Sequence, residues 1–94
     1  MHKYQIVLAI MRIVEVFGGE YSRWRIGITS NLPRRYREHA ERGRNLLRNL
    51  VWQANSLEDA RDIESFFINH MGMAGGTGGD IEEGKPVFVY IMPE

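Results

Sequence analysis

The first apolar segment, residues 4–17, constrains the fold most, because it decides whether the chain begins with a helix or a strand. Its large apolar residues recur every three or four positions, which is the spacing of one helix face. Gly18-Gly19 follows directly and suits the left-handed turn that often ends a helix. Six isoleucines and valines are compatible with a strand, but the segment is longer than a usual strand. It therefore predicts a helix, with an apolar stripe formed by Ile6, Ile10, Ile13, Val14 and Phe17.

Two more helices and three short strands are predicted along the chain. Residues 23–29 alternate apolar side chains with arginine or glycine, which is typical of a half-buried strand. A serine or asparagine cap precedes the helix that begins near Pro33, and six glycines within 72–84 indicate a loop. The predicted helices are 4–17, 33–42 and 57–71, and the predicted strands are 23–29, 50–54 and 86–92. We expect one α/β (α+β) domain over residues 1–94, with a small three-stranded sheet flanked by helices.

A strong segregation of charge underlies the neutral total. Residues 21–50 carry eight arginines against two glutamates, whereas residues 51–94 carry two basic residues against eight acidic ones. The field of the basic segment favours a polyanionic partner, and arginine is the side chain suited to two-pronged phosphate contacts. The alternative is that the basic and acidic segments pair with each other across the fold.

Missing residue types exclude several classes of protein. Without cysteine, the chain has no disulfide, cysteine–zinc site or thiol nucleophile. The three histidines lack the spacing of a zinc site. The longest uncharged apolar run, Tyr4–Met11, is too short to cross a bilayer, and no secretory leader is recognised. We therefore expect no membrane partner and a cytoplasmic location.

Residues 25–39 are the most informative stretch. A glycine ends the predicted strand, a short turn follows, and the next helix carries an arginine eight residues after the glycine and a histidine four residues later. This order resembles the second motif strand of the GIY-YIG nuclease family, which is followed by the pattern T-x-N-L-x-x-R-x-x-x-H. The likeness continues in the apolar segment around Glu64 and covers residues 24–72, about half of the chain.

The resemblance implies a role for each matching residue. Gly27 corresponds to the glycine of the YIG triplet, which lets backbone and substrate approach closely, and Arg35 to the arginine that supports the scissile phosphate. Glu64 corresponds to the single carboxylate ligand of a divalent metal, Mg²⁺ or Mn²⁺, and His39 to a histidine near the site. The chain departs from the pattern where Arg25 replaces the YIG tyrosine and where the upstream GIY triplet and the late asparagine are missing.

The residues themselves indicate the same chemistry. Hydrolysis of a phosphodiester needs an activated water and positive charge at the developing phosphorane. An arginine near a helix start can present its fork to a phosphate, and one carboxylate with water and substrate oxygens suffices for Mg²⁺. Glu64 interrupts an apolar helix face, so its carboxylate needs a partner. That partner is either the metal or Arg35 in a buried ion pair.

The missing first tyrosine leads to a hypothesis about topology. In the GIY-YIG family, the first strand of a small antiparallel sheet carries that tyrosine. If residues 4–17 form a helix, the strand 86–92 is free to take the vacant place. Tyr90 would then stand where the first tyrosine normally stands, with Tyr21 and Tyr36 as competing candidates.

The sequence therefore predicts a divergent GIY-YIG-type, Mg-dependent endonuclease whose partner is nucleic acid, with DNA favoured over RNA. Catalytic candidates are Arg35, His39, Glu64 and Tyr90, and nucleic-acid-binding candidates are Arg25, Gly27, Arg34 and Arg37. We expect Arg35 and Glu64 to share one concave face, with Gly27 at its floor. His39 would lie at its edge. The alternatives are a non-catalytic nucleic-acid- or protein-binding module and a regulatory protein whose acidic half docks a basic partner. A homodimer or a protein partner would compensate for the small surface.

Overall fold

The computed structural model describes residues 1–43, 50–76 and 81–94. In chain order the elements are α1 (Lys3–Val16), the 3₁₀ turn η1 (Tyr21–Arg23), β1 (Trp24–Thr29), α2 (Leu32–Glu41), β2 (Val51–Ala54), α3 (Leu57–Asn69), β3 (Ala74–Gly75) and β4 (Val87–Pro93). The α+β class predicted from the sequence is confirmed. Arg44 and Arg48 of the basic segment, and residues 77–80 of the predicted loop, lie outside the described residues. None of the helices in the described ranges is both long and apolar enough to span a bilayer.

The first segment is a helix, as its apolar spacing predicts. α1 buries Ile6, Ile10 and Val14 completely. Gly18 and Gly19 follow it with φ angles of 112° and 76°, which is the left-handed backbone that glycine adopts without strain. Packing of the stripe therefore outweighs the strand preference of its β-branched residues, because propensity is a weak effect beside burial.

β4 organises the sheet. The strand order is β2-β4-β1-β3, so β4 separates β1 from β2 and pairs antiparallel with both. β3 adds a parallel edge of two residues to β1, at Arg25↔Ala74 and Ile26↔Gly75. The prediction of three strands is wrong in this respect, because β3 falls inside the predicted loop 72–84. So short a pairing is made by the backbone and leaves no alternation of side chains to detect.

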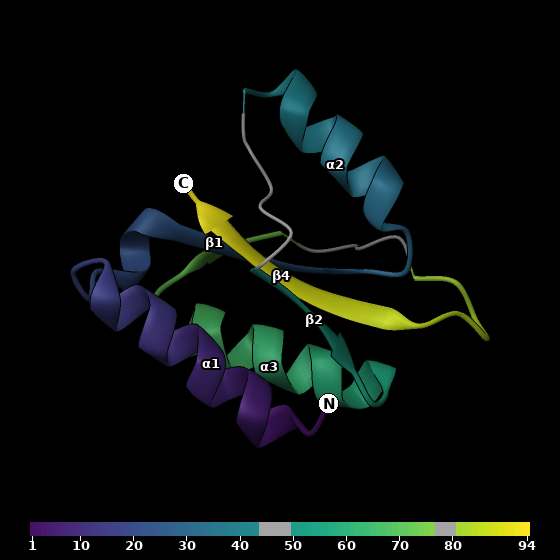
Figure 1. The fold of residues 1–94 in the computed structure, drawn as a ribbon, viewed down its shortest axis with the longest axis horizontal. Helices are drawn as coiled ribbons and strands as arrows, with labels where there is room; N and C mark the ends of the chain where they lie inside the picture. The colour runs from purple at the N-terminus through teal and green to yellow at the C-terminus, as the bar shows by residue number, and fades with distance from the viewer. Residues whose placement is uncertain (44–49, 77–80) are drawn as a thin grey trace.

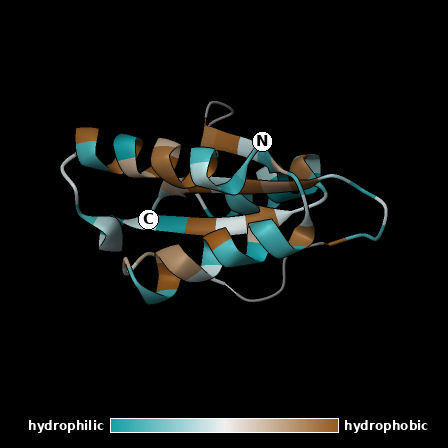
Figure 2. Cartoon of the chain, turned by 90° about the horizontal axis from the view of Figure 1, so that it is seen from below, coloured by the Kyte–Doolittle hydropathy of each residue, from teal (hydrophilic) through white to brown (hydrophobic). Residues whose placement is uncertain are grey.

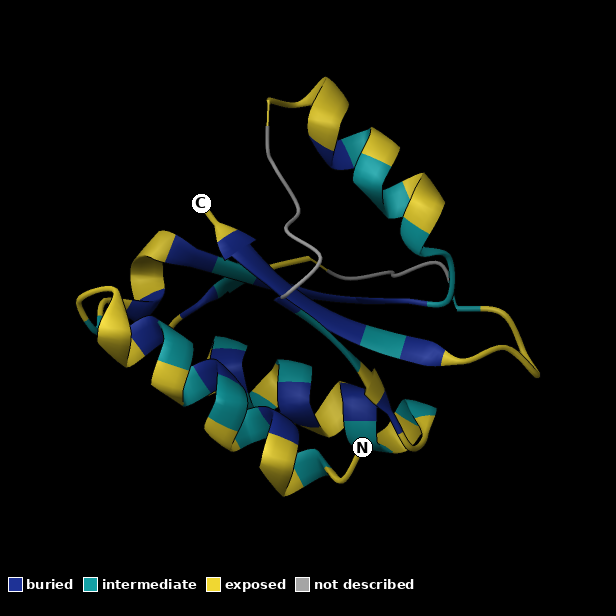
Figure 3. Cartoon of the chain, viewed as in Figure 1, coloured by how far each residue is buried: buried dark blue, intermediate teal, exposed yellow. Residues whose placement is uncertain are grey.

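Helices cover the two faces of the sheet unequally (Figure 1). α1 and α3 pack side by side on one face, and α2 lies on the other. The inner sides of α1 and α3 and most of β1 and β4 are buried, whereas α2 is largely exposed (Figure 3). Hydrophobic and hydrophilic residues share each long helix (Figure 2), as expected of helices with one buried face. The core therefore lies between the sheet and the α1–α3 pair.

Alternation along β1 and β4 decides which residues face α2. Ile26 of β1 and both Val89 and Ile91 of β4 belong to the hydrophobic core. Successive side chains of a strand point to opposite faces of the sheet. Gly27 and Tyr90, which are directly paired across the two strands, therefore lie on the face toward α2.

Candidate functional site

A pocket of about 210 Å³ lies where α2, α3, β1 and β4 meet. Its ionisable lining residues are Arg25, Arg35, His39, Arg42, Glu64 and Tyr90. Among the described lining residues, three arginines against one glutamate give a net positive charge, which suits an anionic ligand. Gly27 lines the pocket as well, so the structure brings together all four residues expected on one concave face.

Gly27 is required by its neighbour on the adjacent strand. It pairs with Tyr90 across β1 and β4. A Cβ atom at position 27 would collide with Cζ and Oη of the Tyr90 ring. The Tyr90 phenol therefore fills the space beside Gly27. Glycine is needed at position 27 to make room for this ring rather than for a substrate.

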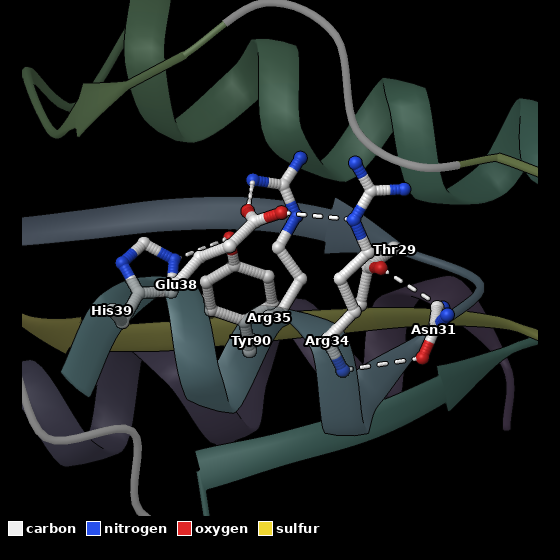
Figure 4. Close-up of polar contacts among 7 residues, drawn as sticks. All are labelled: Thr29, Asn31, Arg34, Arg35, Glu38, His39 and Tyr90. Carbon is white, nitrogen blue, oxygen red and sulfur yellow. Dashed lines mark hydrogen bonds and ion pairs between the residues drawn. The ribbon is translucent and has the colours of Figure 1, made fainter. Parts of the chain in front are cut away.

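His39 and Tyr90 form a buried pair. His39 Nε2 and Tyr90 Oη are 3.1 Å apart, and the two rings meet edge to face. Only 5% of His39 and 3% of Tyr90 is exposed. His39 reaches the phenol from α2, one helical turn after Arg35 (Figure 4). The imidazole and the phenol share one hydrogen bond, whose donor is set by the histidine tautomer.

The topological hypothesis requires the last strand to lie beside β1 and residues 4–17 to form no strand. β4 lies beside β1, and α1 contributes no strand to the sheet. Tyr21 instead contacts Glu15 and stacks on Phe67. Neither Tyr21 nor Tyr36 belongs to the described lining of the pocket. Tyr90 is therefore the tyrosine that shares the pocket with the arginines.

The start of α2 is fixed by a cap built from the end of β1. Thr29 is fully buried, and its Oγ1 accepts a hydrogen bond from the backbone N–H of Asn31 at 2.9 Å. Asn31 Oδ1 accepts in turn from the backbone N–H of Arg34 at 3.2 Å, which caps the helix. α2 therefore begins about one turn before Arg35 and carries that residue to the pocket (Figure 4).

Glu38 joins the two arginines in the first half of α2. Its Oε1 accepts from Nε of Arg34 and its Oε2 accepts from Nη1 of Arg35, both at 3.0 Å (Figure 4). The Arg35 side chain is only 18% exposed. Glu38 was not selected from the sequence, although its spacing of three and four residues from two arginines is a usable signal. Glu38 therefore orients Arg35.

The other basic candidates separate into two groups. Arg25 lines the pocket, and so does Arg42, which the sequence motifs did not single out. Arg34 and Arg37 are exposed on α2 and are absent from the described lining. Arg25 forms an ion pair with Glu94, so the alternative of pairing between the basic and acidic segments holds at this position.

Glu64 is the acidic residue of the pocket, and it is partly buried. Burial raises the pKa of its carboxyl group, and the positive charges of Arg61 and Arg35 oppose the rise. Arg35 donates to Glu38 rather than to Glu64. Within the described ranges no ion pair to Glu64 is present, so the ion-pair explanation for its burial is not observed.

Glu64 is the described residue of the lining that could contribute a ligand to a divalent cation. In the described part of the chain, no three histidine, aspartate or glutamate residues cluster closely enough to hold a metal. Glu64 offers one carboxylate inside the pocket, and the arginines there would attract phosphate oxygens that complete the coordination. Mg²⁺ and Mn²⁺ accept such a set, because they retain water and prefer oxygen ligands.

Burial also raises the pKa of the Tyr90 phenol. Arg35 and Arg25 oppose the rise, whereas Glu64 and Glu38 add to it. The phenol is consequently protonated at neutral pH and has to lose its proton before it can act as a base.

We expect Glu64→Gln to stabilise the protein at neutral pH. Because its pKa is raised, the folded state holds the Glu64 proton more tightly than the unfolded state does. Stability is therefore lost as the pH rises from the ordinary glutamate pKa through the raised folded value, and glutamine removes that loss. Melting temperatures of the two proteins, measured from acidic to neutral pH, should diverge across this window and run parallel above it. A constant difference at every pH would contradict the burial of an ionised Glu64.

Comparisons with known proteins add no family. No protein-family model, no curated protein and no solved structure matches the chain. The GIY-YIG resemblance therefore rests on the residues quoted for it.

Proposed function

We propose that the protein is a divergent GIY-YIG-type, metal-dependent endonuclease that hydrolyses phosphodiester bonds of DNA. The observation that carries the proposal is the pocket shared by Arg35, His39, Glu64 and Tyr90. These residues come from α2, α3 and β4, so their proximity arises from the fold rather than from closeness in the sequence. The positive lining supports a substrate that carries phosphate. The cysteine-free composition agrees with the cytoplasmic location that we propose.

Arg35 binds the scissile phosphate in this proposal. Its Nη1 donates a hydrogen bond to Glu38, and the residue lines the pocket. Because the group is positioned before the substrate arrives, it can stabilise the negative charge of the phosphorane without further reorganisation. The side chain forms two parallel hydrogen bonds with phosphate more readily than lysine does.

Tyr90 and His39 remove a proton from the attacking water. His39 Nε2, 3.1 Å from the phenol oxygen, takes the proton from Tyr90 Oη. The phenolate then accepts a proton from water as the water oxygen bonds to phosphorus, and the P–O bond to the leaving sugar oxygen breaks, that oxygen taking a proton from solvent. Arg35 and Arg25 favour this ionisation, because both lower the pKa of the phenol against the effect of burial.

Glu64 holds the divalent metal. When bound, Mg²⁺ would act as a Lewis acid on the phosphate oxygens and neutralise part of their charge. The carboxylate itself would contribute one ligand from a partly buried position on α3. A second copy of the chain or a protein partner would extend the surface available for DNA.

We expect DNA binding to weaken steeply with salt and to depend on Arg35. For three or four phosphate contacts, raising the salt concentration from about 50 to about 200 mM should weaken binding by roughly 10²-fold. Arg35→Ala should reduce the salt dependence by about one phosphate contact. Fluorescence anisotropy with a labelled DNA duplex, in the absence of divalent metal, measures both effects. Arg12→Ala removes the same charge from an exposed position on α1, on the opposite face of the sheet, and serves as the matched control. Binding that does not respond to salt would contradict a phosphate-bearing partner.

A second candidate function is a non-catalytic DNA-binding module. The observation that favours it is Arg25, which stands where the family has its second tyrosine and which pairs with Glu94. A plasmid-nicking assay with Mg²⁺ or Mn²⁺, and with a chelator as control, separates the two functions. Metal-dependent nicking supports the nuclease. DNA binding without nicking in either metal would establish the binding module instead.

A further inference from the structure

Arg25 lies at the pocket with its side-chain fork already engaged. Its Nε donates to Glu94 Oε2 at 2.9 Å and its Nη2 donates to Oε1 at 3.1 Å. The two hydrogen bonds are parallel, which is the arrangement that an arginine also uses to bind a phosphate. The third nitrogen, Nη1, faces Gly76, because it is the atom that a Cβ at that glycine would meet, at 4.0 Å. Gly76 lines the pocket, so the guanidinium extends along its wall.

The pair does not hold β4 against β1 by itself. The backbone N–H of Glu94 donates to the carbonyl of Arg23 at 2.8 Å. The ladder between the strands continues through Trp24↔Pro93 and Arg25↔Met92. Because the main chain already fixes the end of β4, a purely structural role for the side-chain pair is redundant.

The same pair is also accessible enough to be exchanged. The two side chains are 23% and 33% exposed, so an anion that enters the pocket can reach the guanidinium and compete with the carboxylate for it. A phosphate from DNA presents the same pair of acceptor oxygens as the carboxylate and carries its charge on a polyanion. Arg25 and Arg35 both favour ionisation of the Tyr90 phenol, which indicates that they approach it from β1 and from α2.

We propose, on the basis of the function proposed above, that Arg25 is a second phosphate-binding arginine of the pocket and that the Glu94 carboxylate occupies its fork until a DNA phosphate replaces it. Glu94 then acts as an internal competitor. Its carboxylate keeps the guanidinium extended in the free protein and lowers the affinity of the pocket for the backbone of DNA.

The test measures DNA affinity in Glu94→Gln and Arg25→Gln, by anisotropy with a labelled duplex in chelator. Glu94→Gln should tighten binding several-fold, because the charged competitor for the Arg25 fork is removed, and should steepen the salt dependence by about one contact. Arg25→Gln should weaken binding and flatten the salt dependence, and the double variant should behave like Arg25→Gln. Arg25→Lys, which keeps the charge without the fork, provides a second variant if Arg25→Gln does not fold.

The ion pair between Glu20 and Arg23 supplies matched controls. It joins the same residue types, but neither residue is in the described lining of the pocket. Glu20→Gln changes the net charge as Glu94→Gln does, so equal effects of the two substitutions would overturn the proposal. Arg35→Ala distinguishes the two levels of inference. If Arg35→Ala weakens DNA binding but Glu94→Gln changes the affinity no more than Glu20→Gln does, the proposed role of Arg25 is wrong and the proposed function stands. If the wild type does not bind DNA at low salt, the proposed function fails with it.

Discussion

Glu64→Gln should abolish metal-dependent DNA cleavage while DNA binding in chelator is kept or becomes tighter. The carboxylate is the acidic group of the described pocket lining, and its loss removes the ligand that we propose for the metal. A decrease of about 10²–10³-fold or more is expected, as for other groups that stabilise a transition-state charge. Binding is spared because removing a negative charge beside the arginines favours a phosphate. Initial rates of plasmid nicking, with binding measured in parallel, test both statements.

Glu58→Gln is the matched control for this prediction. Glu58 lies on the same helix, in its first turn, and is exposed. Its substitution should leave nicking unchanged. Because Glu64→Gln is also expected to raise the melting temperature, loss of activity cannot be attributed to unfolding. Full metal-dependent cleavage by Glu64→Gln would end the nuclease proposal.

Gly27→Ala should destabilise the protein substantially. The added methyl group collides with the Tyr90 ring, and overpacking of this kind costs about 1–3 kcal/mol. For a domain of this size each kcal/mol lowers the melting temperature by about 4–8 °C. Thermal unfolding followed by circular dichroism measures the shift.

Two further variants assign that loss to the contact with Tyr90. In a Tyr90→Ala background, Gly27→Ala should cost little, because the ring that it meets is gone. Gly76→Ala, where the nearest atom is the Arg25 guanidinium at 4.0 Å, should be tolerated. Equal tolerance of Gly27→Ala and Gly76→Ala would contradict the close packing of the Tyr90 phenol against β1.

The periodicity of the sequence was sufficient to predict most of the helices and strands. α1 follows from the stripe that contains Ile6 and Ile10, because burial of one helix face leaves a repeat that can be counted. β4 follows from a run of β-prone residues. The edge strand β3 does not, since Ala74 and Gly75 pair through the backbone alone. The sheet order could be anticipated only as a hypothesis, because it depends on which strand fills the place next to β1.

The candidate site was predicted in part. Arg35 and His39 were selected from a motif that fixes their spacing and Glu64 from its place in an apolar helix, and the fold gathers all three in one pocket. Glu38 and Arg42 were not selected, because an acidic and a basic residue on a charged helix resemble an ordinary solvated face. The reason for glycine at position 27 could not be predicted from the sequence either, because it depends on the register of two strands that are distant in sequence.

The central place of β4 determines when the molecule can form during synthesis. β1 and β2 do not pair with each other and both depend on β4, although they leave the ribosome first. A nascent chain that has emerged only as far as α3 carries Arg35, His39 and Glu64 but lacks the strand that joins the two halves of the sheet. Contacts between such distant segments form late and make folding slow. Assembly of the sheet and completion of the pocket by Tyr90 are therefore one event, and a partly synthesised chain has no finished pocket.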